Sequence, residues 1–199
     1  MDDGREFVQI SAAYGDITRF CADAIVNAAN CTLLGGGGVD GAIHRAAGPQ
    51  LYLECQKFGG CRTGEAVVTP GFNLMAKYII HTPGPVWNPE RAEECDALLC
   101  SCYRNALLRA EEKGCNTIAF PSISTGVYRF PLERAAALVA KTLVEFFEDR
   151  ETCLQAVTMV CFDEKTFKAY HDAISAALIS RLEITVLEPE EFAAEDFAL

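Results

Sequence analysis

The sequence predicts an α/β fold, in which a layered sheet alternates with helices. Two observations support this prediction. Short apolar runs typical of buried strands recur along the chain, and most of them are separated by longer stretches with one apolar face, which is typical of helices. No Ser-, Gly- or Pro-rich linker, internal repeat or low-complexity segment divides residues 1–182, so this part is expected to form one domain.

Six runs are predicted to be strands because they are short and apolar. In chain order they are Phe7–Ala13, Ala24–Ala28, Ala66–Pro70, Tyr78–His81, Thr117–Pro121 and Ala156–Cys161.

Three helices are predicted from apolar residues that recur at helical spacing. One begins near Pro89 and stops near Gly114, a second starts at Pro131, which suits a first helical position, and a third follows Asp163, a predicted N-cap. Their apolar faces are Ala92, Cys95, Leu99, Cys102, Tyr103, Ala106 and Ala110; Leu132, Ala135, Ala136, Val139, Leu143 and Phe146; and Phe167, Tyr170, Ile174 and Leu178.

The composition is that of a globular protein. The chain has 199 residues, of which 50% are apolar and 23% charged. No apolar run approaches the roughly 20 residues of a membrane helix, and residues 1–6 lack the pattern of a signal peptide. We therefore expect a cytoplasmic protein with no membrane partner.

Ten cysteines are spread along the chain rather than grouped in a disulfide framework. In a chain that can bury a substantial core, we expect them to be reduced thiols. No CxxC pair exists, so no bound metal is expected.

The net charge of −11 argues against a nucleic-acid duplex as a partner, because phosphate backbones bind basic surfaces. Part of this charge lies at the end of the chain, since residues 183–199 hold six acidic residues and no Lys or Arg. We expect this segment to be a solvated acidic tail.

Two glycine-bearing turns, Gly35–Gly41 and Ser122–Tyr128, each lie between a strand-like run and a helix. Glycine lets backbone N–H groups approach an anion closely, and a helix N-terminus supplies unpaired donors with a favourable dipole. Two such turns can hold a diphosphate from both sides, so the sequence predicts a nucleotide diphosphate ligand.

The first turn also fits the dinucleotide fingerprint, as Gly36-x-Gly38-x-x-Gly41. A nicotinamide-dependent oxidoreductase would need an acidic residue about 20 positions on, to hold the ribose. The strand in that place ends Val67-Val68-Thr69-Pro70 and carries none, which argues against this class.

Two asparagines, Asn27 and Asn30, stand where the second strand-like run leads into the glycines. Their side chains can bind sugar hydroxyls, or they can simply form turns. Asp40 has a similar ambiguity, because it can act as the N-cap of the following helix.

Several segments together resemble the macrodomain family, specifically the MacroD-type hydrolases. They occur in the family's order over about residues 8–180 and are Gly15–Thr18, Ile25–Asn30, Gly36–Gly48, Thr63–Ala66, Tyr78–Thr82 and Ser122–Tyr128. The resemblance implies a three-layer α/β/α sandwich with a mixed central sheet, a macrodomain over residues 1–182 with a tail at 183–199, and ADP-ribose as the ligand.

The resemblance also assigns the adenosine end of the site. It implies that Asp16 pairs with the adenine amino group and that Ile17 lines the adenine pocket. Phe162 matches a position that often contacts the adenosine, although a core aromatic is an equal alternative.

For the other end of the ligand, the resemblance implies that Gly37, Gly38 and Val39 hold the diphosphate and distal ribose from one side. Ser124, Thr125, Gly126, Val127 and Tyr128 would close over the other side. Asn30 would contact the distal ribose, and Asn27, which we also place among the ligand-binding residues, would support the loop.

The resemblance implies that Asp40, together with Asn30, carries the chemistry. In MacroD-type hydrolases the Asp that matches Asp40 is implicated in activating or orienting water. Hydrogen bonds from helix N–H groups would fix it and lower its pKa. His44, four residues on, could assist or be a buried structural histidine.

The implied activity is metal-independent hydrolysis, without a cofactor, of ester-linked ADP-ribose. Substrates would be mono-ADP-ribosyl-Asp/Glu on proteins and O-acetyl-ADP-ribose; the alternative is a reader that binds ADP-ribose without turnover. We expect a monomer whose partners are ADP-ribose and ADP-ribosylated proteins.

Two departures from the family pattern, Arg129 in place of glycine and Pro83 in place of valine, affect the second loop and a strand end.

Overall fold

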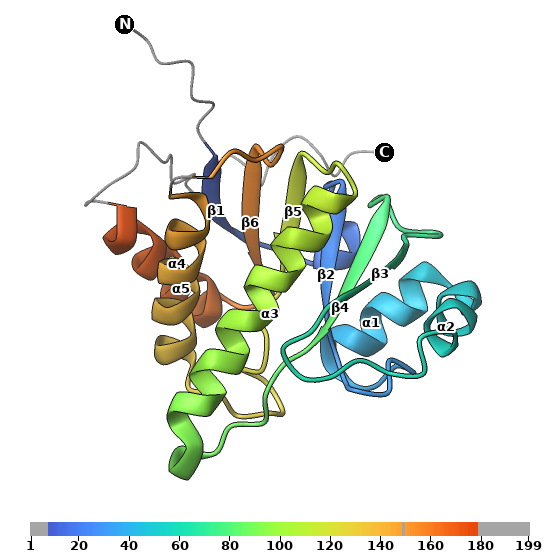
Figure 1. Ribbon diagram of the computed structural model, residues 1–199, viewed down its shortest axis with the longest axis horizontal. Coiled ribbons are helices and arrows are strands. Elements are labelled where there is room, and N and C mark those ends of the chain that lie inside the picture. Colours follow the sequence, from blue (N-terminus) through green and yellow to red (C-terminus); the bar gives the residue numbers. More distant parts are fainter. Residues whose placement is uncertain (1–7, 149, 179–199) are drawn as a thin grey trace, which may run out of the picture.

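The computed structural model describes residues 8–178 apart from residue 149, and the expected tail at 183–199 lies outside this range. Its centre is a six-stranded sheet with the order β1-β6-β5-β2-β4-β3 (Figure 1). Neighbouring strands are parallel except β3, which runs antiparallel to β4 at the edge. The strands are β1 (Gln9–Tyr14), β2 (Ala24–Ala29), β3 (Val67–Pro70), β4 (Tyr78–Pro83), β5 (Thr117–Phe120) and β6 (Ala156–Cys161).

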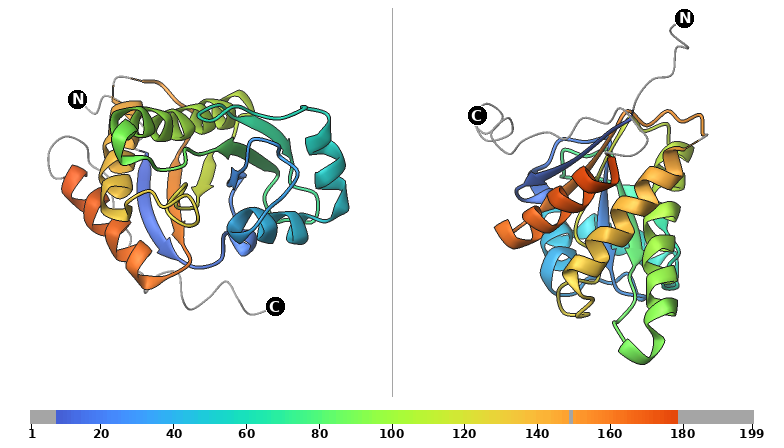
Figure 2. Two further views of the ribbon diagram at one scale, coloured as in Figure 1. Left: turned by 90° about the horizontal axis from the view of Figure 1, so that it is seen from below. Right: turned by 90° about the vertical axis from the view of Figure 1, so that its left-hand side faces the viewer.

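Helices cover both faces of this sheet, as the two views of Figure 2 show. On one face lie α1 (Gly38–Ala47), α2 (Pro49–Gln56) and the 3-10 turn η1 (Ile17–Arg19). On the other lie α3 (Ala92–Glu112), α4 (Leu132–Phe147) and α5 (Glu164–Leu178). The predicted α/β/α sandwich with a mixed sheet is therefore confirmed.

The central strands are buried on both faces, so their side chains alternate between two apolar cores. On β5, Ile118 and Phe120 pack against α3, α4 and α5, whereas Ala119 joins the core under α1 and α2. On β4, Ile80 packs in the core on the side of α3, α4 and α5, whereas Ile79 packs in the core under α1 and α2. The core beneath α1 and α2 is the smaller of the two, and it underlies the first glycine turn.

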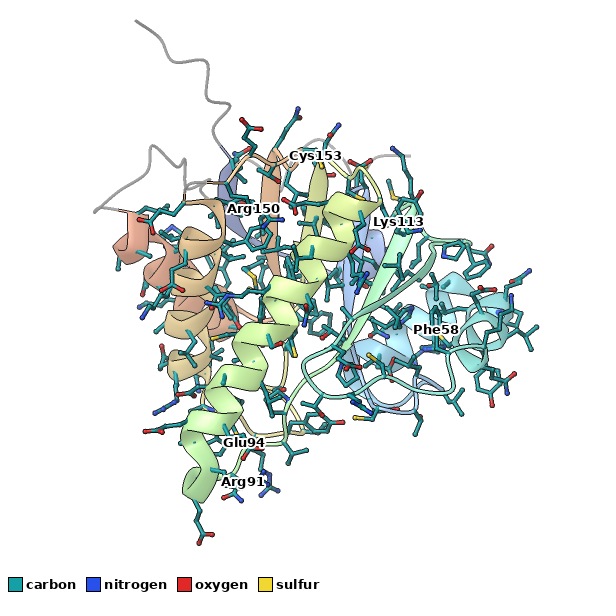
Figure 3. All side chains as sticks on the ribbon, viewed as in Figure 1. Phe58, Arg91, Glu94, Lys113, Arg150 and Cys153 are labelled. Atoms are coloured by element: carbon teal, nitrogen blue, oxygen red, sulfur yellow. The ribbon has the colours of Figure 1, made fainter. Side chains whose placement is uncertain are left out.

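All six predicted strands exist close to their predicted bounds, but some helix ends differ. A 3-10 turn, η2 (Pro89–Arg91), precedes α3, because Asn88 caps it by accepting a hydrogen bond from the Glu90 N–H. Its Arg91 pairs with Glu94 on the first turn of α3 (Figure 3). Pro131 is the N-cap of α4 rather than its first residue. Helix α2 was not predicted, whereas Asp163 caps α5 as expected by accepting from the Thr166 N–H at 2.8 Å.

The ten cysteines are all free thiols. Most are buried, and an exposed one, Cys153, lies close to Arg150 at the edge of the sheet where the parallel strands begin (Figure 3).

No helix in the described part of the chain is both long and apolar enough to span a membrane.

Candidate functional site

A cleft of about 430 Å³ opens at the carboxyl ends of the parallel strands. Its walls come from the segments that leave β1, β2, β4, β5 and β6, and the left panel of Figure 2 looks onto this edge. Ligands of open α/β sheets bind at this edge, because each parallel strand delivers a loop there. The cleft brings together these predicted residues: Ile17, Asn30, Gly37, Gly38, Val39, Asp40, Ser124, Thr125, Gly126, Val127, Tyr128 and Phe162.

The first wall is the loop between β2 and α1, and Asn30 organises it. The Asn30 amide Nδ2 donates to the Gly35 carbonyl at 2.9 Å, while its Oδ1 accepts from the N–H and the hydroxyl of Thr32. The loop needs glycine at position 35, whose φ is +82°, and Gly36 lies directly over Asn30 and Asp40. Asn30 therefore shapes the loop while lining the cleft.

Asp40 lies at the floor of the cleft and is only 4% exposed. The expectation that it caps the helix is wrong, because Gly37 is the N-cap of α1 and Asp40 is in its first turn. Its Oδ1 accepts from Asn27 Nδ2 at 2.7 Å. Its Oδ2 is buried against the Gly36 loop, and no donor among the described residues bonds to it.

The electrostatic environment of Asp40 also differs from the expectation. Burial raises the pKa of this carboxyl, while the hydrogen bond from Asn27 and the nearby His44 oppose the rise. His44 Nε2 is 3.5 Å from Oδ1, one helical turn along α1. A buried carboxylate with a raised pKa is a better base than one bonded to helix N–H groups.

Asn27 does not line the cleft, so its assignment as a ligand-binding residue is corrected here. It is fully buried on the α1 face of the sheet, and its Nδ2 contacts Asp40 and His81 Nδ1. Asn27 therefore supports Asp40 from below.

The second wall is the loop after β5, and hydroxyl groups hold it in place. Ser122 Oγ contacts Thr125 Oγ1 at 2.6 Å and the Tyr170 hydroxyl at 3.0 Å. Ser124 has a φ of +65°, and its buried hydroxyl lies against Gly84, which follows β4. A side chain at position 84 would occupy the space of the loop.

The two departures from the family pattern have local effects. Arg129 is exposed and has a φ of +57°, a conformation that glycine adopts without strain. Pro83 ends β4, where its carbonyl accepts from the Gly64 N–H at 3.0 Å. Neither side chain lines the cleft.

At the far end of the cleft, Phe162 is 78% exposed, which rules out the alternative of a core aromatic. Asp16 does not line the cleft, although its neighbours Gly15 and Ile17 do. Its Oδ1 caps η1 by accepting from the N–H and the hydroxyl of Thr18, at 2.9 and 2.8 Å. Both bonds use the same carboxylate oxygen.

A family model described as "Macro domain" matches residues 26–139. The chain belongs to the Macro domain family. This macrodomain is 56% identical over 169 residues to a Macro domain-containing protein of Lactiplantibacillus plantarum, covering 85% of this chain and 98% of that one. It is 49% identical to a protein of Salmonella typhimurium named O-acetyl-ADP-ribose deacetylase, covering 81% and 92% of the two chains.

Solved macrodomain structures have the same fold. The Oceanobacillus iheyensis macrodomain with ADP superposes with a TM-score of 0.79 and 42% identity, covering 84% of this chain and 90% of that one. The Trypanosoma brucei macrodomain in complex with ADP-ribose gives 0.78 and 42%, covering 83% and 69%.

Some residues of this macrodomain's site were missed at the sequence level. Gly84 is a single glycine after a strand and carries no motif, so only the packing of Ser124 against it reveals its role. His81 is at the end of a predicted strand, and only its register with Asn27 brings it under the site. In the described ranges, no group of three or more His, Cys, Asp and Glu side chains is placed to hold a metal ion.

Proposed function

We propose that this macrodomain hydrolyses ester bonds at the distal ribose of ADP-ribose. Its substrates would be O-acetyl-ADP-ribose and mono-ADP-ribose linked to protein Asp or Glu side chains. The observation that carries this proposal is Asp40, a buried carboxylate on the floor of the cleft with one oxygen bonded to Asn27 and the other unbonded within the described residues. Relatives named O-acetyl-ADP-ribose deacetylase support the reaction type.

The two loops fit the diphosphate of such a ligand. Gly37 is the N-cap of α1 and Gly38 its first residue, so the unpaired N–H groups of this helix and the positive end of its dipole favour an anion between the first loop and the Ser124–Tyr128 loop. Backbone donors need no Lys or Arg cluster, which explains how an acidic protein could bind a dianion. Solved relatives that hold ADP or ADP-ribose support this ligand class.

The adenosine would occupy the other end of the cleft. Ile17 offers an apolar floor there, and the exposed ring of Phe162 offers a surface on which a base can stack. The second carboxylate oxygen of Asp16, which is not used in the η1 cap, could accept a hydrogen bond from the adenine amino group.

In the proposed reaction, the Asp40 carboxylate accepts a hydrogen bond from a water molecule at the floor of the cleft and orients it as the water oxygen attacks the ester carbonyl carbon. The bond between the acyl carbon and the ribose oxygen then breaks. The acyl group leaves as a carboxylic acid that contains the water oxygen and one of its hydrogens, and the other hydrogen of the water passes as a proton to the ribose oxygen. A diphosphate oxygen of the ligand can share in holding the water. The positioned water contributes through proximity.

The competing function is a reader that binds ADP-ribose without turnover. The experiment that separates them measures ADP-ribose release from O-acetyl-ADP-ribose and from a glutamate-linked mono-ADP-ribosylated protein, with ADP-ribose affinity measured alongside. Asp40→Ala should retain binding and lose turnover by about 100-fold or more. Asp172→Asn, which removes an exposed carboxylate on α5, is the matched control and should behave like the wild type.

Three results are informative. Tight binding without release by the wild type would identify a reader. Equal turnover by wild type and Asp40→Ala would remove Asp40 from the chemistry. Release of ADP-ribose from only one of the two substrates would define the acyl group that this macrodomain accepts.

A further inference from the structure

A row of buried polar side chains runs beneath the cleft, from the edge strand β3 to Asp40. Thr69 Oγ1 lies 3.0 Å from His81 Nε2, His81 Nδ1 lies 3.1 Å from Asn27 Nδ2, and Asn27 Nδ2 lies 2.7 Å from Asp40 Oδ1. Thr69, His81 and Asn27 are at most 1% exposed. None of these three side chains lines the cleft, so no ligand contact explains their presence.

The sheet sets up this row. Asn27 on β2 and His81 on β4 are register partners in a parallel pair, so their side chains stand next to each other on the same face of the sheet. Antiparallel β3 brings Thr69 to the outer side of His81, and α1 places Asp40 over Asn27. Each polar group is thus fixed by the backbone of a different element.

One arrangement of hydrogens pairs every contact of the row while Asp40 is ionised, and it leaves Asn27 Oδ1 without a hydrogen-bond partner among the described residues. Asn27 must point its amide nitrogen at Asp40, because its oxygen would repel the carboxylate. The second hydrogen of this amide then faces His81 Nδ1, which must be an acceptor. His81 therefore carries its hydrogen on Nε2 and donates it to Thr69 Oγ1, and the Thr69 hydroxyl donates to the Pro70 carbonyl at 3.2 Å.

The charge state of His81 agrees with this assignment. Complete burial, with a smaller effect from His44, lowers the pKa of His81 to about 3, so the ring is neutral near pH 7. The titratable side chains that face Asp40 are His44 of α1, Cys55 of α2 and, through Asn27, His81 of β4. Burial raises the pKa of Cys55 to about 11, so it is a neutral thiol, 3.9 Å from His81 Nε2.

We propose that His81, supported by Thr69, is a positioning residue that orients the Asn27 amide and through it the Asp40 carboxylate. With Nδ1 as an acceptor, Asn27 is held with both amide hydrogens directed at fixed partners. Asp40 Oδ1 is then bound, and Oδ2 has no hydrogen-bond donor among the described residues. The effect on turnover rests on the proposed hydrolase function, whereas the effect on Asp40 ionisation does not.

The first test needs no activity. In NMR spectra of the protein labelled with ¹⁵N-histidine, His81 should be neutral with its hydrogen on Nε2 from pH 8 to pH 5, and its signals are identified by their absence in His81→Asn. A hydrogen on Nδ1, or a charged ring in this range, would overturn the proposal.

The second test titrates the Asp40 carboxyl by ¹³C NMR, with assignment by its loss in Asp40→Asn. Thr69→Val removes the acceptor of the Nε2 hydrogen with little change of shape, and Thr69→Ser keeps a hydroxyl. Proton affinity of Asp40 should rise by up to about fivefold in Thr69→Val and in His81→Leu, and stay unchanged in Thr69→Ser. The same Asp40 pKa in all four proteins would contradict the proposal.

The third test is kinetic. With O-acetyl-ADP-ribose, kcat should fall about tenfold in His81→Leu and less in Thr69→Val, with KM little changed and the acid limb of kcat moved to higher pH. His81→Asn, which has a polar atom near the Nδ1 position, should recover part of the loss. If the folded variants keep the wild-type kcat and acid limb, the positioning role is wrong.

These tests separate the two proposals. A wild type that turns over neither substrate refutes the hydrolase, while the tautomer and the Asp40 titration still decide the role of His81. Thermal unfolding of each variant shows whether a change reflects loss of the fold, and Thr69→Val keeps the test decisive if His81→Leu does not fold.

Discussion

Alanine in place of Gly84 should displace the second wall of the cleft. A Cβ at position 84 would lie 2.5 Å from Ile123 Cγ2 and closer still to Ser124 Oγ, whereas ordinary contacts begin at 3.4 Å. The side chains of Ile123 and Ser124, with the loop that carries them, would therefore have to give way by about 1 Å, since β4 fixes the backbone on the other side. Gly84 has no positive φ, so the effect comes from packing alone.

The expected magnitude follows from that displacement. Overpacking of this kind lowers the free energy of unfolding by about 1–3 kcal/mol. A displacement of about 1 Å in a group that positions the substrate lowers kcat/KM by about 100-fold. ADP-ribose affinity should fall as well, because the loop supplies one side of the proposed diphosphate site.

The assay is ADP-ribose titration by calorimetry together with turnover of O-acetyl-ADP-ribose and urea unfolding. Val86→Ala is the control, because this exposed side chain belongs to the same segment after β4 and should leave all three quantities unchanged. Wild-type affinity, turnover and stability in Gly84→Ala would refute the idea that Gly84 seats the loop.

Two further predictions concern stability. Arg129→Gly should raise the free energy of unfolding by about 0.5–1 kcal/mol, because relief of a left-handed conformation outweighs the greater chain entropy of glycine; Arg129→Ala, which keeps the Cβ, should gain nothing in urea unfolding. For His81, the native pKa of about 3 lies below the unfolded value near 6.5, so the unfolded state binds more protons between these pH values. The free energy of unfolding should therefore fall as the pH drops from about 6.5, by up to about 1.4 kcal/mol per pH unit from this residue, and His81→Leu should flatten this slope between pH 7 and pH 5.

Local patterns predicted most of the strands and helices of this macrodomain. The strands are short apolar runs, and the apolar stripes of α3, α4 and α5 have clear helical spacing, with Asp163 as a visible cap. Helix α2 was not predicted, because its eight residues bury only Leu51 and Cys55 in the core, and two apolar positions are too short a pattern to indicate a helix. Strand order and direction depend on long-range pairing, and the mixed sheet was expected only from the family resemblance.

The residues of the site were predicted unevenly, for a physical reason. Loop residues such as Gly37 and Gly126 belong to continuous motifs, and the structure gathers them in one cleft. The surroundings of Asp40 depend on partners distant in sequence, so its bond to Asn27 and its raised pKa could not be read from neighbouring residues. For the same reason, Asn27 was assigned to the ligand although it lies beneath the cleft.

The division of the interior into two unequal cores has a consequence for how the protein loses function. The side chains of Asp40, Asn27 and His81 lie on the face that α1 and α2 cover, where the smaller core is, whereas the strands of the sheet also contribute side chains to the larger core. A sub-global opening that releases α1 and α2 can dismantle the site while most of the sheet persists. Heat or denaturant would then inactivate this macrodomain before it unfolds, as a separate and earlier transition.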